Sequence, residues 1–353
     1  MKRTFITVIA AMFSASLFAQ TEVDKFVPGS TLDGVNYFLP QTAFRLIVET
    51  EETVTTPGSL AKYAQHYLRM NDVPMRVSTQ HKIKSIKLEA YGLPDHNKAI
   101  NVKVKSKTIA PLVTLSPDGL LLAINKEVKQ QKLSDIPTDI PAAPVTDPRE
   151  YMTQEMLRAG SFAKQAELIA QEIYDIRESR NELVRGEADN TPKDGAQLQL
   201  MLQQLDEQAE ALESFFKGTT QTSTHYTVLY VLPTAEKEQI IARFSSHFGL
   251  VDKDDLSGTP IYMNLQPQTK IPETVQNEST DKKKSKMIKG VYYNVPVRER
   301  VSIYTNTETF LQKDVAMAQF GTTEILSDIL FNKGVTTRVS FFQQTGAIEK
   351  LEQ

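Results

Sequence analysis

Cysteine and tryptophan are both absent from this chain of 353 residues. Without cysteine there is no disulfide, zinc ribbon, iron–sulfur cluster, thiol nucleophile or lipid-modified N-terminal cysteine. An excess of one charge is missing as well, since 40 basic residues stand against 43 acidic ones and the net charge is −3. Such a chain is a poor nucleic-acid binder by bulk electrostatics. Hydrophobic residues make up 40% of the chain, which is enough for a packed core and excludes wholesale disorder.

Long hydrophobic runs are absent except near the N-terminus. Residues 1–19 consist of Met-Lys-Arg, a short apolar run and Ala19, which is the pattern of a secretory signal peptide. The run is too short for a membrane span, which needs about 20 apolar residues, and no second such run follows. We therefore expect cleavage near Ala19–Gln20 and a mature chain without a transmembrane segment. It would carry 38 basic and 43 acidic residues, and it would be periplasmic or associated with the outer membrane.

The next part of the chain predicts an N-terminal β-rich domain over 20–132. Residues 34–56 alternate as strands do, with Phe44, Leu46 and Val48 on one face. Residues 59–70 predict a short helix, and proline- and aspartate-rich residues 133–147 predict an extended linker. Further strands are expected at 80–91 and 98–106, with a hairpin at 109–125.

The middle of the chain, 148–217, predicts an antiparallel helical hairpin. One apolar stripe runs from Met152 to Leu183 at steps of three and four, and a second runs from Leu198 to Phe216. The two helices would be about 57 Å and 39 Å long. Because only a short polar loop follows Gly186, they must fold back on each other. The hairpin is expected either to brace the β-domains or to bind a partner.

The remainder returns to strand patterns. We divide it into a β-strand region at 218–267, a lysine-rich polar loop at 268–289 and a C-terminal β-unit at 290–353. Strands are expected at 223–232, 239–251, 260–266, 290–295, 299–306, 313–320 and 337–342, with a final hairpin at Thr345-Gly346. The predicted fold class is α+β, mainly β, with two related β-rich domains and a long antiparallel helical hairpin inserted between them.

Three landmarks of the N-terminal half recur in order in the C-terminal half. The sequence GVNYFLP at 34–40 matches GVYYNVP at 290–296. Tyr91-Gly92 matches Phe320-Gly321, and VTLSPDG at 113–119 matches VSFFQQTG at 339–346. The pattern predicts that 34–125 and 290–353 are related by an internal duplication.

These landmarks also resemble a known family. The start GVNYFLPQTAFRLIVETE, Lys217-Gly218, the LSGTPI sequence at 256–261 and the AQFG sequence at 318–321 are similar to a family of uncharacterised exported proteins of about 350 residues. The family comes from Bacteroidetes-type bacteria and is described only as a domain of unknown function. The resemblance implies secretion and a mixed β fold with a helical hairpin, and it carries over no catalytic residues.

Local motifs for catalysis or cofactor binding are missing. The five histidines have no spacing typical of a metal site, so we predict no metal and no cofactor. They are His66, His81, His96, His225 and His247. A Ser/His/Asp triad could still assemble from distant segments, because triads are defined by geometry.

Five tyrosines are candidates for stacking against sugars, although strand and helix spacing also suits half-buried core positions. They are Tyr37, Tyr63, Tyr67, Tyr292 and Tyr293. Three hypotheses follow. The first is a non-enzymatic envelope scaffold or adaptor that binds a protein partner through the helical hairpin. The second is a glycan- or peptidoglycan-binding module, and the third is a hydrolase with a site between the domains.

Overall fold

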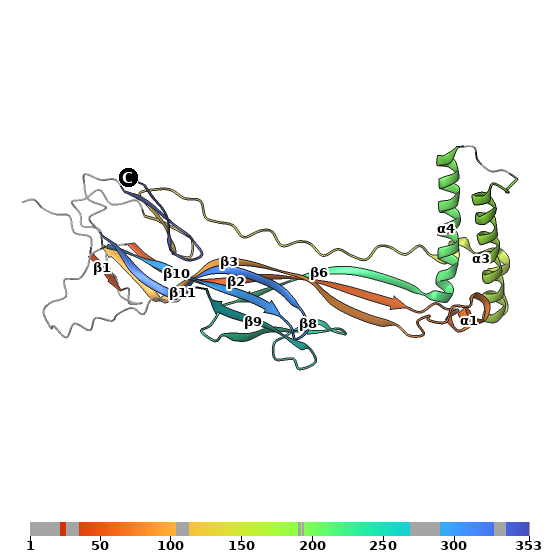
Figure 1. Cartoon of the computed structure of the whole chain (residues 1–353), viewed down its shortest axis with the longest axis horizontal. Helices are drawn as coiled ribbons and strands as arrows, with labels where there is room; N and C mark the ends of the chain where they lie inside the picture. The colour runs from red at the N-terminus through yellow and green to blue at the C-terminus, as the bar shows by residue number, and fades with distance from the viewer. Residues whose placement is uncertain are drawn as a thin grey trace, which may run out of the picture.

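The computed structural model describes residues 22–25, 35–103, 113–189, 192, 194–268, 290–327 and 337–352. The expected signal peptide at 1–19 and nearly all of the lysine-rich loop lie outside the described residues. The described part is mainly β, as the sequence predicts, with two long helices between β-sheets. It is elongated, with β-sheets over most of its length and helices at one end (Figure 1).

Thirteen strands are described. They are β1 (Glu22–Lys25), β2 (Val35–Thr56), β3 (Ser78–Lys103), β4 (Val113–Leu115), β5 (Leu121–Ile124), β6 (Thr219–Val231), β7 (Glu238–Ser245), β8 (Gly249–Val251), β9 (Thr259–Pro267), β10 (Gly290–Tyr304), β11 (Thr309–Ser327), β12 (Arg338–Phe341) and β13 (Ile348–Glu352). The helices are η1 (Ala61–Tyr63), α1 (Ala64–Leu68), η2 (Pro148–Tyr151), α2 (Gln154–Leu157), α3 (Phe162–Arg185) and α4 (Gly195–Lys217).

The strands form three antiparallel sheets among the described residues. Sheet A has the order β1-β3-β2-β6, sheet B the order β13-β12-β5-β4, and sheet C the order β11-β10-β9-β7-β8. Sheets A and C face each other around a core that includes Phe44, Leu46, Met263, Ile303 and Met317. All five side chains are fully buried, because alternate residues of each strand point to the same face.

Two strands of sheet A extend beyond this sandwich. β2 has 22 residues and β3 has 26, so each is longer than about 70 Å at the usual strand rise. Their far ends and the start of β6 form an arm, residues 50–56, 78–83 and 219–225, that carries the helices (Figure 1).

The prediction of two separate strands at 80–91 and 98–106 is wrong, because β3 runs through both. Pro94 lies opposite Pro40 of β2, where the register shifts. A shift of this kind tolerates proline, because the ladder is already interrupted there.

A single first helix from 148 to 185 is also wrong. Ser161 adopts extended backbone angles and accepts a hydrogen bond from the Lys164 amide, so it starts α3 anew. The preceding residues form only the short helices η2 and α2. With 24 and 23 residues, α3 and α4 are about 36 Å and 35 Å long.

Sheet B joins the two predicted β-units. β5 of the N-terminal unit pairs with β12 of the C-terminal unit, and Val339 lies opposite Ile124. Tyr37, Leu121, Val291 and Val339 share one buried cluster beneath this sheet. The two units therefore pack together.

The repeated landmarks occupy equivalent places. The Phe38 amide donates to the carbonyl of Gly119, and the matching Asn294 amide donates to the carbonyl of the matching Gly346, at 2.8 and 3.2 Å. Pro40 and Pro296 each lie at a shift in strand register. An internal duplication would produce such contacts, and it stays a prediction.

Candidate functional site

The helices at the end of the arm form one unit, the helical head, made of residues 60–68 and 148–217. Its core contains Leu60, Ile169, Ile173, Leu212 and Phe216, none of which is exposed. The apolar stripes predicted from the sequence supply these residues from α3 and α4. The short helix predicted at 59–70 packs against the apolar stripes of α3 and α4 at the end of the hairpin nearest the arm, and it completes the core of the head.

Hydrogen bonds inside the head join its short helices to the hairpin, and a glycine joins the head to the arm. The Leu60 amide donates to the Phe215 carbonyl at 2.7 Å, and the Tyr174 hydroxyl donates to the Tyr67 carbonyl at 2.9 Å. Gly218 links α4 to β6 with φ +77°, and a Cβ there would lie 2.1 Å from the Thr56 carbonyl oxygen. Only glycine fits this close approach, so it fixes the direction in which α4 leaves the arm.

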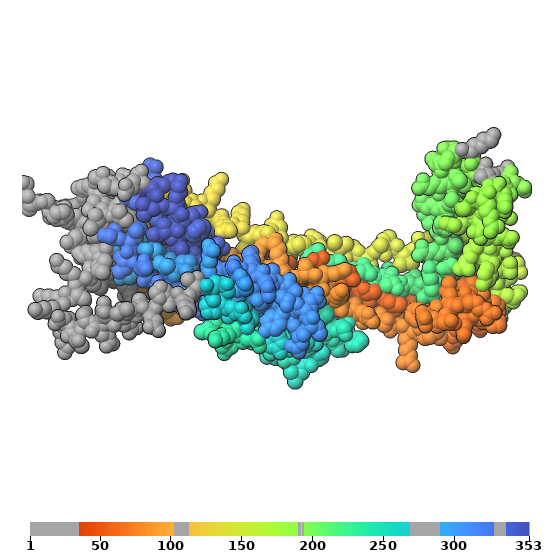
Figure 2. Space-filling view, viewed as in Figure 1, coloured from red at the N-terminus to blue at the C-terminus, as the bar shows by residue number. Residues whose placement is uncertain are grey.

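The far half of the hairpin, which we call the prong (residues 181–205), is not covered by any third helix among the described residues. It stands up from the arm with its end away from the sheets (Figure 2). Val184 and Leu200 there are 60% and 54% exposed, and Leu198, Met201 and Leu202 are only half-buried. The ion pairs Arg177–Glu213 and Arg180–Asp206, at 2.7 and 2.6 Å, hold the helices together just below it.

The hairpin region is strongly acidic. Residues 148–217 contain 14 acidic and 8 basic residues, a net charge of −6, whereas the whole chain has a net charge of −3. The negative charge of the protein is therefore concentrated in the head, and the rest of the chain is close to neutral.

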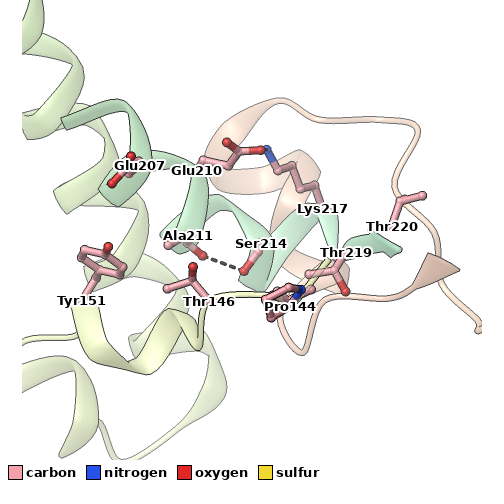
Figure 3. A pocket seen from close by; sticks show the side chains of 12 residues that line it. Pro144, Thr146, Tyr151, Glu207, Glu210, Ala211, Ser214, Lys217, Thr219 and Thr220 are labelled. Carbon is pink, nitrogen blue, oxygen red and sulfur yellow. Dashed lines mark hydrogen bonds and ion pairs between the residues drawn. The ribbon is translucent and has the colours of Figure 1, made fainter. Parts of the chain in front are cut away.

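A cavity of about 560 Å³ lies at the inner corner between α4 and β6, beneath the linker (Figure 3). Tyr151 and Glu207 border one side, and Lys217 extends toward Glu210, 3.9 Å from its carboxylate. The Ser214 hydroxyl donates to the Ala211 carbonyl, so it is already satisfied. The lining is polar and contains two glutamates, which suits a basic side chain.

Sequence reasoning missed this cavity. Glu207, Glu210 and Ser214 follow each other at steps of three and four, so they share one face of α4. The spacing of these three residues can be seen in the sequence. That Pro144–Thr146 of the linker form another wall of the cavity cannot.

The linker is fastened to the arm by an ionic latch of His225, Asp139 and Glu52. The Nδ1 atom of His225 lies 3.0 Å from Asp139, and its Nε2 atom lies 3.1 Å from Glu52. The Tyr226 amide donates to Asp139, and Ile140 pairs with Thr224 as an isolated bridge. Together these contacts cover part of the free edge of β6.

Ser223 completes a triad-like geometry, because its Oγ lies 3.0 Å from Nε2 of His225. The hydrogen bond with Asp139 and the bond with Glu52 raise the pKa of His225 and favour the imidazolium. Nε2 also lies within hydrogen-bond distance of Glu52, so Ser223 shares its only contact with the ring with a carboxylate. The arrangement therefore favours a latch over a nucleophilic centre.

The other histidines are placed as follows. His81 lies opposite Glu52 in the β2–β3 register, and its amide donates to Ser246 in the β7–β8 turn that also contains His247. His66 packs edge-on against Tyr67, and His96 packs against Phe38. Over the described ranges, no group of three or more His, Asp or Glu residues could hold a metal ion.

The five tyrosines singled out from the sequence fall into two distant groups. Tyr37 is 1% exposed, and its hydroxyl bonds to the backbone of Tyr292, so it is a core residue that no ligand reaches. Tyr292 and Tyr293 are half-buried beside it, whereas Tyr63 and Tyr67 pack on the core of the helical head. The structure does not bring them together into one surface.

None of the helices in the described part of the chain is long and apolar enough to cross a bilayer. No curated protein and no solved structure matched the sequence. The model of one family, Domain of unknown function (DUF4831), matches residues 33–349. This match includes most of the three sheets, the linker and the helical head, so the chain belongs to the DUF4831 family.

Proposed function

We propose that this protein is an exported adaptor of the bacterial cell envelope, which holds a partner protein through the acidic helical head. One observation carries the proposal: the prong stands at the end of a long arm, with half-buried apolar residues that no other described segment covers. A helix that only braced the sheets would be expected to lie along them.

The chemistry of the head indicates the kind of partner. The net charge of −6 over residues 148–217 and the glutamate-lined corner would favour a partner with a basic surface. The apolar residues of the prong would supply the buried centre of the contact, since interface cores are depleted in charge. Export itself is supported by the signal-peptide pattern at 1–19 and is tested by the mass of the mature chain, which should begin at Gln20.

The test compares the full chain with a variant that lacks the prong. Because Arg180 and Asp206 pair at 2.6 Å, residues 181–205 can be replaced by a short Gly-Ser connection without opening the core at the base. Both forms are expressed in the native host and crosslinked in envelope fractions. We expect one crosslinked partner to disappear with the prong, and to weaken in high salt for the full chain.

Leu256→Ser on the loop before β9 provides the matched control, because Leu256 is highly exposed and far from the head in sequence. This variant should keep the partner. An identical set of crosslinked proteins with and without the prong would contradict the proposal.

A further inference from the structure

Two adjoining hollows lie beside β3, where the linker leaves sheet B. Their volumes are about 340 and 600 Å³. Both are lined by Ala90, Gln131, Lys132, Leu133 and Gln344, so they form one groove. Its walls are β3, the start of the linker, β11 and the turn between β12 and β13. Gly92 allows that turn to sit close, since a Cβ there would lie 2.1 Å from the Gln343 carbonyl oxygen.

Four glutamines contribute side-chain amides to the polar lining of the groove. Gln130 and Gln131 come from the linker, and Gln343 and Gln344 come from the β12–β13 turn. The side-chain oxygen of Gln343 accepts a hydrogen bond from the backbone amide of Gln131, which fixes the Gln343 side chain in the wall. Within the described residues, the side-chain amides of Gln130, Gln131 and Gln344 have no hydrogen-bond partner. Each amide offers two donors and one acceptor, which is the pairing that sugar hydroxyls require.

Tyr91 supplies an aromatic ring to the same groove. Its ring packs edge-on against Tyr230, with centroids 6.2 Å apart and an angle of 85°. This contact limits the ring to one orientation, which lowers the entropy cost of stacking. Neither tyrosine belongs to the set singled out from the sequence, because their contact depends on β2 lying between β3 and β6.

The charges around the groove are balanced. Lys87, Lys132 and Lys313 face Glu89, Asp118 and Asp314. Glu89 is paired with Arg45 and Lys87, and Asp314 is paired with Arg300. An anionic or cationic ligand gains little from such a lining, whereas a neutral polyol finds amides and an aromatic ring.

We infer that this groove binds a neutral oligosaccharide, which stacks on Tyr91 and forms hydrogen bonds with the surrounding amides. This site is separate from the helical head, so either proposal can fail without the other. The head would bind the protein partner, and the groove would bind the sugar.

The absence of tryptophan makes a direct experiment possible. Tyr91→Trp would introduce the single tryptophan of the chain, as a fluorescent reporter at the groove. Cellotetraose, maltotetraose, mannotetraose and fully N-acetylated chitotetraose are titrated to about 10 mM, which covers weak saccharide affinities. We expect at least one of them to give a saturable change in emission. Tyr293→Trp, at a half-buried tyrosine on β10, is the matched control and should not respond.

Calorimetry on the unsubstituted chain tests the same sugar without a reporter. Tyr91→Ala should weaken binding by about tenfold or more, Tyr91→Phe by no more than about threefold, and Gln344→Ala by about threefold. If Tyr91→Ala does not fold by circular dichroism, the Gln344→Ala result decides. No binding of any tetrasaccharide by the unsubstituted chain, or binding that these groove variants leave unchanged, would overturn the inference.

Discussion

Arg45 and Glu89 form an ion pair on the face of sheet A that the linker crosses. Ser134 of the linker donates to Glu89, and its carbonyl accepts from Arg45, so the pair also anchors the linker. Burial alone would raise the pKa of Glu89, but hydrogen bonds from Ser134, Arg45 and Lys87 outweigh it and lower the pKa to about 2. The side chain is 16% exposed, so solvent screens these contacts only in part.

We expect Glu89→Gln to lower the free energy of unfolding by about 2 to 3 kcal/mol at pH 7. Because the folded pKa lies below the ordinary value of 4.5, the carboxylate stabilises the fold above that value. The contribution is lost as the pH falls from about 5 to 2, so the two proteins should converge there. Urea unfolding at pH 7, 4 and 3 measures this. Glu51→Gln, which breaks the exposed pair with Lys84, should cost under about 1 kcal/mol.

His225 is the residue whose titration reports the latch. Its bond to Asp139 is the largest cause of its raised pKa, and Glu52 adds to it. A raised pKa means that the charged latch stabilises the fold at low pH and weakens as the pH rises through the folded pKa. We expect an NMR titration to place the pKa of His225 above 6.5.

Asp139→Asn should return this pKa toward the ordinary value. It should also speed amide hydrogen exchange at Ile140 and Thr224, because the linker is released from the edge of β6. The free energy of global unfolding should change little, since Asp139 and His225 form a solvent-exposed ion pair. A pKa of His225 at or below 6.5 would contradict the latch.

At the scale of elements, the junction between α4 and β6 is the most constrained position. Gly218→Ala would place a methyl group against the Thr56 carbonyl at a positive φ, so we expect a loss of at least about 2 kcal/mol. Gly195→Ala is the matched control, because a Cβ there meets nothing within 4 Å and Gly195 begins a helix. It should leave stability unchanged or raise it by up to about 1 kcal/mol. Urea unfolding compares the two, and equal effects would contradict the assigned constraint.

Elements that depend on local chemistry could be predicted from the sequence. α4 was predicted because Asp194, the apolar stripe and Lys217-Gly218 specify a start, a buried face and a stop within one segment. The single strand β3 and the broken first helix were not. Pro94 is tolerated because the strand register shifts beside it, and Met156, just before the new start at Ser161, is buried in the head core.

The candidate sites were harder to predict from the sequence than the helices and strands. The sequence predicted the helical hairpin, but the cavity at its base also needs linker residues that run back along the arm. Tyr91 and Tyr230 are far apart in sequence and meet only through sheet A. The tyrosines chosen from strand and helix spacing are instead core residues or distant from one another, as Tyr37 shows.

At the scale of the whole molecule, the radius of gyration and the maximum dimension report the elongated shape. A compact chain of this length would have a radius of gyration of about 20 Å. β3 alone is about 85 Å long, with the helical head beyond its end. Small-angle scattering of the mature chain should therefore give a radius of about 30 Å or more and a maximum dimension above about 85 Å. A radius near 20 Å would contradict the extended arm.

The pairing of β5 with β12 has a consequence for biosynthesis. Ile124 and Val339 lie 215 residues apart in the sequence, so sheet B stays incomplete until the C-terminal strands have been synthesised. Contacts of such long sequence separation form slowly. Premature termination would leave an edge of sheet B open to aggregation.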